Sequence, residues 1–212
     1  MNNDTLMVVL QVAALVFAVC VHESAHGAVA LWCGDPTARD LGRITLNPLR
    51  HVDPFGTILL PAMLALSGAP VFGWAKPVPV VLERARDPRR ARLLVSAAGP
   101  LSNLILAGLF AALASRLRAL ETAGPIAQCL FWFALFSVLV NVALAVFNLL
   151  PVPPLDGFGV VEGLLPPSLD GLVATIRQLG MPILLALIFT GALRNILGPA
   201  QRLAVRWLLG HP

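Results

Sequence analysis

Long apolar runs interrupted by few polar residues dominate the hydrophobic pattern of this chain. They cover roughly residues 5–33, 93–114, 130–150 and 179–193. About 20 apolar residues suffice for an α-helix to cross the hydrocarbon core of a bilayer, so the first three runs predict membrane-spanning helices. After the last run, Arg202 and Arg206 are spaced as on one face of an interfacial helix.

The region between the first two long runs has a different pattern. Residues 40–54 alternate apolar and polar side chains and then break at prolines, which predicts a short strand and a turn. Residues 73–81 alternate Pro and Val, which favours an edge strand because each proline withholds a donor that a central strand would need. Residues 55–67 are apolar but shorter than a full crossing, so they predict a re-entrant segment, with a full crossing as the alternative.

The predicted fold class is therefore an all-α polytopic membrane protein. We expect about four to five transmembrane helices, a small membrane-associated β element and a re-entrant segment. Composition agrees, because 58% of the residues are hydrophobic and 12% are charged, whereas soluble domains contain about 25% charged residues. No stretch has the mixed composition of a soluble module, so residues 1–212 predict a single membrane-embedded domain.

The positive charge of the chain is unevenly distributed. The net charge is +4, and residues 84–92 contain a cluster of arginines beside a long apolar run. The positive-inside rule makes this cluster a cytoplasmic anchor rather than a nucleic-acid-binding patch. We expect the lipid bilayer, and no nucleic acid, as a partner. The three cysteines are too few and too scattered for a disulfide framework.

The first apolar run contains the pattern H-E-x-x-H, formed by His22, Glu23 and His26. On a helix, histidines four residues apart project from one face and can hold one zinc ion, while the glutamate can serve as general base. Ionisable groups inside a span cost at least about 2–3 kcal/mol each, so three together indicate a function. A polar helix-packing patch or a proton relay is the alternative.

A catalytic zinc ion commonly has three protein ligands, so a third ligand must come from elsewhere in the chain. Asp156 is the best candidate, because it follows a proline-rich break at membrane depth, where broken helices line cavities. His51 lies in the re-entrant region and His211 at the end of the chain, which makes both weaker candidates. Asp156 has an alternative role as a helix N-cap.

Three motifs together resemble the site-2 protease family of intramembrane zinc metalloproteases, in its compact form without PDZ or CBS domains. The motifs are H-E-S-A-H at residues 22–26, A-G-P-L-S-N at residues 98–103 and N-L-L-P-V-P-P-L-D-G at residues 148–157. The resemblance covers roughly residues 21–163. Residues 73–81 and 47–56 also resemble the membrane-associated β elements and loop of the compact subgroup.

The resemblance implies a zinc metalloendopeptidase that hydrolyses peptide bonds of transmembrane segments. His22, His26 and Asp156 are then the ligands of one Zn²⁺ ion per chain, and Glu23 is the catalytic base. Asn148 is expected to position the substrate or its developing oxyanion.

The expected substrates are single-pass membrane proteins, whose helices must be unwound before a carbonyl is exposed. An edge strand at residues 76–81 could hold the extended substrate by strand addition. The side chains expected to contact the substrate are those of Asn148, Asn103, Lys76, Val78 and Val80.

The depth of the ligands constrains the topology. If residues 55–67 dip into the bilayer and return, two crossings separate His26 from Asp156, and both can reach one metal ion. The arginine cluster at residues 84–92 then lies on the same side as Arg39 and Arg43. The positive-inside rule makes that side cytoplasmic. We therefore expect a multi-pass cell-membrane protein with its active site towards the cytoplasmic half.

Two other functions fit parts of the pattern. A membrane metal-ion or proton transporter needs a polar route across the bilayer, for which Asn103, Asn141 and Ser137 are few candidates. A catalytically inactive membrane adaptor of the same fold is disfavoured by the intact Glu23. The identity of the substrate and the oligomeric state stay open.

Overall fold

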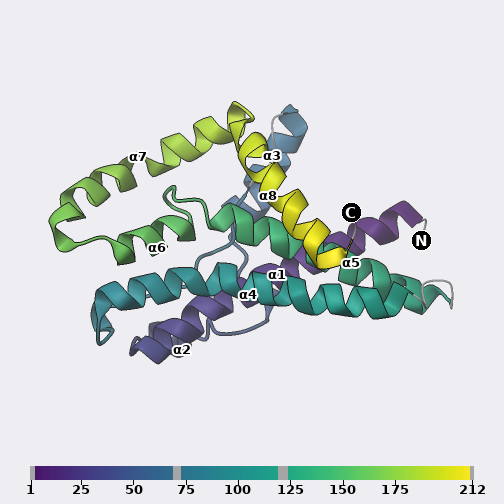
Figure 1. Cartoon of the computed structure of the whole chain (residues 1–212), viewed down its shortest axis with the longest axis horizontal. Helices are drawn as coiled ribbons and strands as arrows, with labels where there is room; N and C mark the ends of the chain where they lie inside the picture. The colour runs from purple at the N-terminus through teal and green to yellow at the C-terminus, as the bar shows by residue number, and fades with distance from the viewer. Residues whose placement is uncertain (1–2, 69–72, 119–123, 211–212) are drawn as a thin grey trace.

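The computed structural model describes residues 3–68, 73–118 and 124–210, and most of them are helical (Figure 1). In these residues, four helices are long and apolar enough to cross a membrane: α1 (Asn3–Cys33), α4 (Pro88–Leu117), α5 (Pro125–Asn148) and α7 (Asp170–Phe189). The shorter helices are α2 (Thr37–Asp40), α3 (Leu60–Ser67), α6 (Asp156–Leu164) and α8 (Ala192–Leu209). The prediction of an all-α, multi-pass membrane protein is confirmed.

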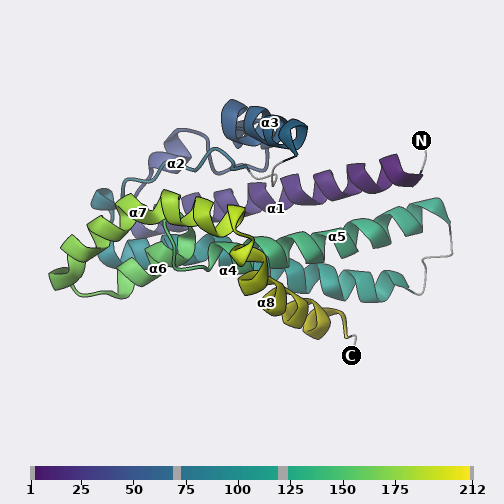
Figure 2. The ribbon, with the colours of Figure 1, turned by 90° about the horizontal axis from the view of Figure 1, so that it is seen from above.

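Helix α4 is the centre of the bundle. It runs beside α1 and α5 in both views (Figures 1 and 2), and α6 also packs against it. Its buried positions are mostly small, among them Ala98, Gly99 and Ala107, whereas large residues such as Leu101 and Leu109 are exposed. Small residues let helix backbones approach closely where both lipid and protein are apolar. The backbones of α1, α5 and α6 therefore pack closely against α4.

The helix break after α5 agrees with the sequence prediction. Pro151, Pro153 and Pro154 follow α5, and α6 begins at Asp156. Helix α6 lies so close to α4 that a Cβ atom on Gly163 would be 2.8 Å from the Cα atom of Leu93. This close approach brings the start of α6 back against the bundle.

The predicted β element is absent from the described residues. Residues 41–53 form turns, bends and the short 3-10 helix Pro48–Arg50, and residues 73–81 are extended but pair with no strand among the described residues. The backbone N–H of Lys76 donates to His51 O at 2.8 Å, and that of Val78 donates to the Glu23 carboxylate at 2.9 Å. The strand prediction was wrong because these donors bind a loop and a helix side chain rather than a neighbouring strand.

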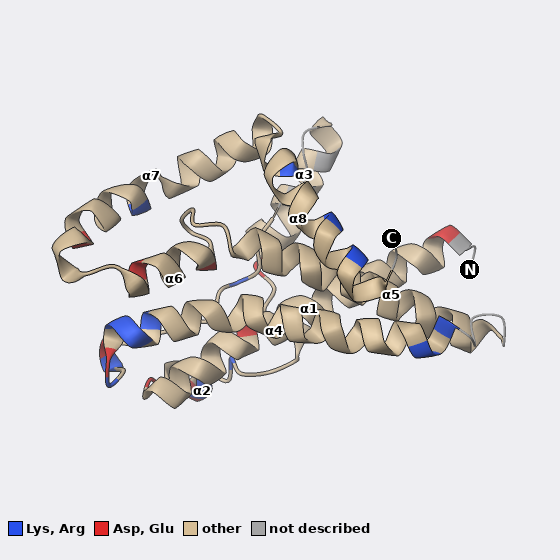
Figure 3. Ribbon diagram, in the orientation of Figure 1, with Lys and Arg blue, Asp and Glu red and all other residues tan. Residues whose placement is uncertain are grey.

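The chain between α1 and α4 returns to the side from which it started. The short π-helix Pro54–Leu59 leads directly into α3 (Figure 2). The backbone N–H of Arg86 then donates to the carbonyl of Cys33, the last residue of α1, at 3.1 Å. Basic residues gather at this end of α4, next to α2 (Figure 3). The end of α1 and the start of α4 therefore lie together, and the re-entrant course of residues 55–67 stays a prediction.

The C-terminal helices differ from the expected boundaries. Helix α7 begins at Asp170, well before the predicted residues 179–193, and is inclined to the other spans (Figure 1). In α8, Val205 and Leu208 pack against a buried cluster that includes Val138, while Arg202 and Arg206 are exposed. The amphipathic character predicted for this helix is therefore observed.

The return of the chain predicts the sidedness of three positions. In a chain without its native cysteines, Leu41→Cys and Asp87→Cys should react with an impermeant thiol reagent from the same side of oriented vesicles. Arg116→Cys, near the other end of α4, should react only from the opposite side. Labelling of positions 41 and 87 from opposite sides would show that residues 54–67 cross the membrane completely.

Candidate metal centre

The orientation of His22 is set by a chain of buried amides. Asn141 donates to Ser137 O at 2.8 Å, and Asn103 donates to Asn141 Oδ1 at 2.8 Å and to Ala18 O at 3.3 Å. The remaining oxygen of Asn103 lies 2.6 Å from His22 Nδ1. Because that oxygen can only accept, Nδ1 of His22 carries the proton and Nε2 presents a lone pair.

His26 is oriented in the same sense by the same helix, α4. Its Nδ1 donates to the backbone carbonyl of Val95 in α4 at 2.7 Å. A carbonyl cannot donate, so Nε2 of His26 also presents a lone pair. One turn of α1 places the two imidazoles on the same face, and their Nε2 atoms are 3.1 Å apart.

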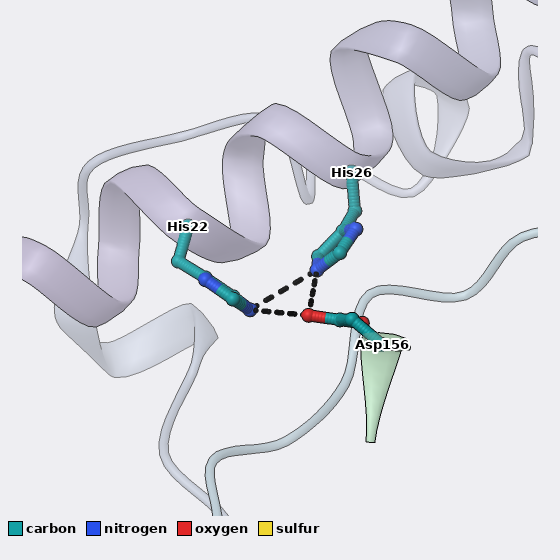
Figure 4. A group of neighbouring side chains, drawn as sticks. All are labelled: His22, His26 and Asp156. Carbon is teal, nitrogen blue, oxygen red and sulfur yellow. Dashed lines mark hydrogen bonds and ion pairs between the residues drawn. The ribbon is translucent and has the colours of Figure 1, made fainter. Parts of the chain in front are cut away.

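Asp156 completes the cluster from the first turn of α6 (Figure 4). Its Oδ2 atom lies 3.1 Å from Nε2 of His22 and 3.4 Å from Nε2 of His26. This buried oxygen has no hydrogen-bond partner in the described part of the chain. The N-cap of α6 is Leu155, and no side chain caps it. The alternative role of Asp156 as a helix cap is therefore not observed.

These three atoms fit a bound cation. Three lone pairs that face one another at 3.1–3.4 Å are mutually repulsive unless a positive ion or a proton lies among them. Two imidazoles and one carboxylate are a common ligand set of catalytic zinc. The backbone of α4 leaves room for an ion, because a Cβ atom on Gly99 would lie 2.4 Å from Nε2 of His26.

Glu23 is adjacent to this cluster in the chain but contacts a different segment. It is half-buried on α1, and its Oε2 atom accepts the backbone N–H of Val78 at 2.9 Å. We find no hydrogen bond to its Oε1 atom among the described residues. One carboxylate oxygen is thus fixed by the extended segment while the other stays available.

The predicted substrate contacts fall into two groups. Asn103 and Val78 are buried, and the amide of Asn103 is fully used within the protein. A direct substrate contact by either residue does not fit this burial, and Asn103 orients His22 instead. Lys76 is exposed, while Val80 and Asn148 are half-buried, so their predicted contacts stay predictions.

His51 lies outside this cluster. Nε2 of His51 donates to Thr45 O at 2.8 Å, outside the cluster, and His211 lies outside the described residues.

Two contributors to the cluster were not recognised from the sequence. Asn141 acts on His22 through Asn103, and Gly99 provides the space beside the imidazoles. A signal for Asn141 was present, because a polar residue inside an apolar span usually has a partner there. The partner itself lies on another helix, which the pattern of one span does not reveal.

Comparison with known proteins decides the family. The sequence model described as "Peptidase family M50" matches residues 10–122. The chain belongs to peptidase family M50. It is 40% identical over 190 residues to "Putative zinc metalloprotease YwhC" of Bacillus subtilis, covering 89% of this chain and 84% of that protein. No solved structure matches it.

More distant relatives agree. This M50 peptidase is 35% and 34% identical to proteins named "Putative zinc metalloprotease Rip2" from Mycolicibacterium smegmatis and Mycobacterium tuberculosis, covering 88% of this chain and 69% of each relative. The resemblance to the site-2 protease family is confirmed, and with it the prediction of a zinc metalloprotease at the level of the family. The roles of the individual residues stay predictions.

The space beside Gly99 gives a test of the centre. Gly99→Ala should reduce bound zinc strongly, because the new methyl group would lie 2.4–2.5 Å from atoms of His26 and His22. Gly108→Ala is the matched control in the same helix, since a Cβ atom there meets nothing within 4 Å. Metal analysis of both purified variants measures the effect. Equal zinc contents would place the ion elsewhere.

Proposed function

We propose that this M50 peptidase is an intramembrane zinc endopeptidase that cleaves transmembrane segments of single-pass membrane proteins. The observation that carries the proposal is the convergence of His22, His26 and Asp156 inside a bundle of spanning helices. Helices α4 and α5 make two crossings between the histidines and Asp156, which is consistent with their meeting at one depth.

His22, His26 and Asp156 would hold one zinc ion per chain. When bound there, zinc supplies a Lewis acid that polarises the scissile carbonyl and makes water more acidic. The chain contributes the orientation of the ligands: the Asn103 amide and the Val95 carbonyl fix which imidazole nitrogens carry protons. Such hydrogen-bonded partners also raise the basicity of ligating histidines.

Glu23 is the general base of the proposed reaction. Its Oε1 atom would take a proton from the attacking water while the water oxygen forms a bond to the carbonyl carbon. The C–N bond then breaks, and Glu23 returns the proton to the leaving nitrogen. The hydrogen bond from the Val78 amide to Oε2 supports these roles, because it anchors one carboxylate oxygen and leaves Oε1 to transfer the proton.

The substrate would reach the site as an unwound segment. Its developing oxyanion could accept a hydrogen bond from Asn148, whose amide also donates to Leu144 O at 3.0 Å. Pro77 and Pro79 have no N–H, so an extended substrate beside them would mainly donate to carbonyls of this segment. Lys76 and Val80 are the side chains proposed to contact it.

The site is proposed to face the cytoplasmic half of the membrane. The arginine cluster at residues 84–92 adjoins the end of α1 that follows the H-E-x-x-H motif, and arginine-rich connectors are enriched on the cytoplasmic side. Reagent added outside intact cells should therefore label position 116 and not position 87.

A transporter is the second candidate considered. Its polar route would have to continue beyond Ser137, the last member of the amide chain that begins at His22. The neighbouring core is apolar and includes Val138, Val142 and Ala107. A closed core of this kind favours hydrolysis at a fixed site over ion passage.

The ligand assignment predicts a specific loss of zinc. Asp156→Ala should lose most of its zinc, because the two imidazoles alone leave the ion short of protein ligands. His51→Ala is the control, since it also removes a buried side chain but one that bonds Thr45 O outside the cluster. It should keep its zinc. Full zinc occupancy in Asp156→Ala would refute the assignment.

The proposed base predicts a separation of chemistry from metal binding. Glu23→Gln keeps the size of the side chain but cannot take the proton, so cleavage should fall by about 10²–10⁴-fold while zinc stays bound. The measurement pairs zinc content with cleavage of a membrane-embedded peptide that carries helix-weakening residues. A variant that keeps both zinc and most of its activity would remove Glu23 from the mechanism.

A further inference from the structure

Arg43 is a buried cation near the candidate centre. It is 8% exposed, and no carboxylate in the described part of the chain lies within ion-pair distance of it. Its Nη2 atom donates to the carbonyl oxygens of Lys76 at 2.8 Å and Pro77 at 3.2 Å. Burying a charge without a counter-ion costs free energy. The burial of Arg43 therefore indicates that this residue has a function that offsets the cost.

The carbonyl of Pro77 and the N–H of Val78 belong to one peptide group. Arg43 binds the oxygen of that group, and Glu23 Oε2 accepts its N–H at 2.9 Å. Because the peptide group is planar, fixing its oxygen also fixes the direction of its N–H. A cation on the oxygen polarises the group and strengthens the hydrogen bond from its nitrogen. Arg43 and Glu23 are thus linked through a single peptide group.

The prolines on both sides of Val78 leave only one backbone N–H in residues 77–79. Pro77 and Pro79 have no N–H and a fixed φ, so Val78 supplies the N–H donor of the tripeptide. Both ends of the segment are also held: Lys76 N donates to His51 O, and Val81 N donates to Asp35 Oδ2 at 2.6 Å. The peptide group at 77–78 is therefore held in place.

The second anchor, Asp35, is charged. Burial would raise the pKa of its carboxyl group, but hydrogen bonds from Thr37 and from the Val81 amide, together with the nearby Arg84, hold that pKa below its usual value. An ionised Asp35 is a strong acceptor for the end of the segment.

We propose that Arg43 is a positioning residue for the hydrolytic reaction, acting on Glu23 through the Pro77–Val78 peptide group. The proposal rests on the role of Glu23 proposed above. Arg43 holds the peptide group, the peptide group holds Oε2, and Oε1 stays directed at the water and the leaving nitrogen. The expected defect of a variant is in turnover rather than in substrate or zinc binding.

A double-mutant cycle tests this coupling. Arg43→Gln should lower kcat by about 10- to 100-fold, the value of one hydrogen bond to a charged group, with KM and zinc content within about twofold. In a Glu23→Gln background the same change should lower the residual rate by less than about twofold, because residues that act as one unit are not additive. Arg43→Lys should recover part of the rate.

Two controls accompany the cycle. Arg39→Gln removes another arginine from the segment between α1 and α4. The exposed side chain of Arg39 pairs only with the adjacent Asp40 among the described residues, so this variant should have the kcat of the wild type. Val78→Pro removes the N–H that Glu23 accepts, whereas Val78→Ala keeps it. Both variants lose the valine side chain, so the proline variant should turn over about 10- to 100-fold more slowly than the alanine variant.

The outcomes separate this inference from the proposed function. If Glu23→Gln loses cleavage but Arg43→Gln retains it, or loses it by the same factor in both backgrounds, only the positioning role is overturned. If Arg43→Gln fails to fold, the comparison of Val78→Pro with Val78→Ala decides, and equal rates overturn the proposal. Full activity of Glu23→Gln would remove Glu23 from the mechanism and the positioning role with it, whereas absence of cleavage by the zinc-loaded wild type would overturn the proposed function itself.

Discussion

Three proton-accepting atoms must meet inside an apolar bundle, and the rest of this structure depends on that requirement. The imidazoles of His22 and His26 and the carboxylate of Asp156 face one another at 3.1–3.4 Å. Their arrangement is repulsive without a cation, so it must be imposed by the surrounding protein. The two rings donate hydrogen bonds to the Asn103 side-chain oxygen and to the carbonyl of Val95, and these acceptors impose the arrangement by fixing the protonated nitrogen of each ring.

The choice of residues in α4 follows from the same requirement. This helix supplies the Val95 carbonyl, the Asn103 amide and, at Gly99, a backbone without a side chain beside the imidazoles. Neighbouring helices can approach it because its buried positions are small, and its large apolar residues are exposed where lipid would surround them. One helix thus provides both the packing of the bundle and the orientation of the site.

The extended segment at residues 73–81 connects Glu23, next to the metal-binding cluster, with Asp35 and His51 in the loops that follow α1. The N–H groups of Lys76, Val78 and Val81 bind the loop carbonyl of His51, Glu23 and Asp35, respectively. A segment held in this way is extended without belonging to a sheet. Contacts from the buried Arg43 reach it from the other side, so the position of Glu23 depends on residues far from it in the chain.

The sequence by itself determined the features that depend on neighbouring residues. Helix length, the one-turn spacing of His22 and His26, and the proline break before Asp156 are local, and all appear in the structure. The tertiary structure decided where hydrogen-bond donors and acceptors find their partners. Asn103 was expected at the substrate and orients His22 instead, and residues 73–81 were expected to pair as a strand. The sequence shows that a polar side chain in a span, or an extended backbone, needs hydrogen-bond partners. Which partners it reaches depends on how helices distant in the chain pack together.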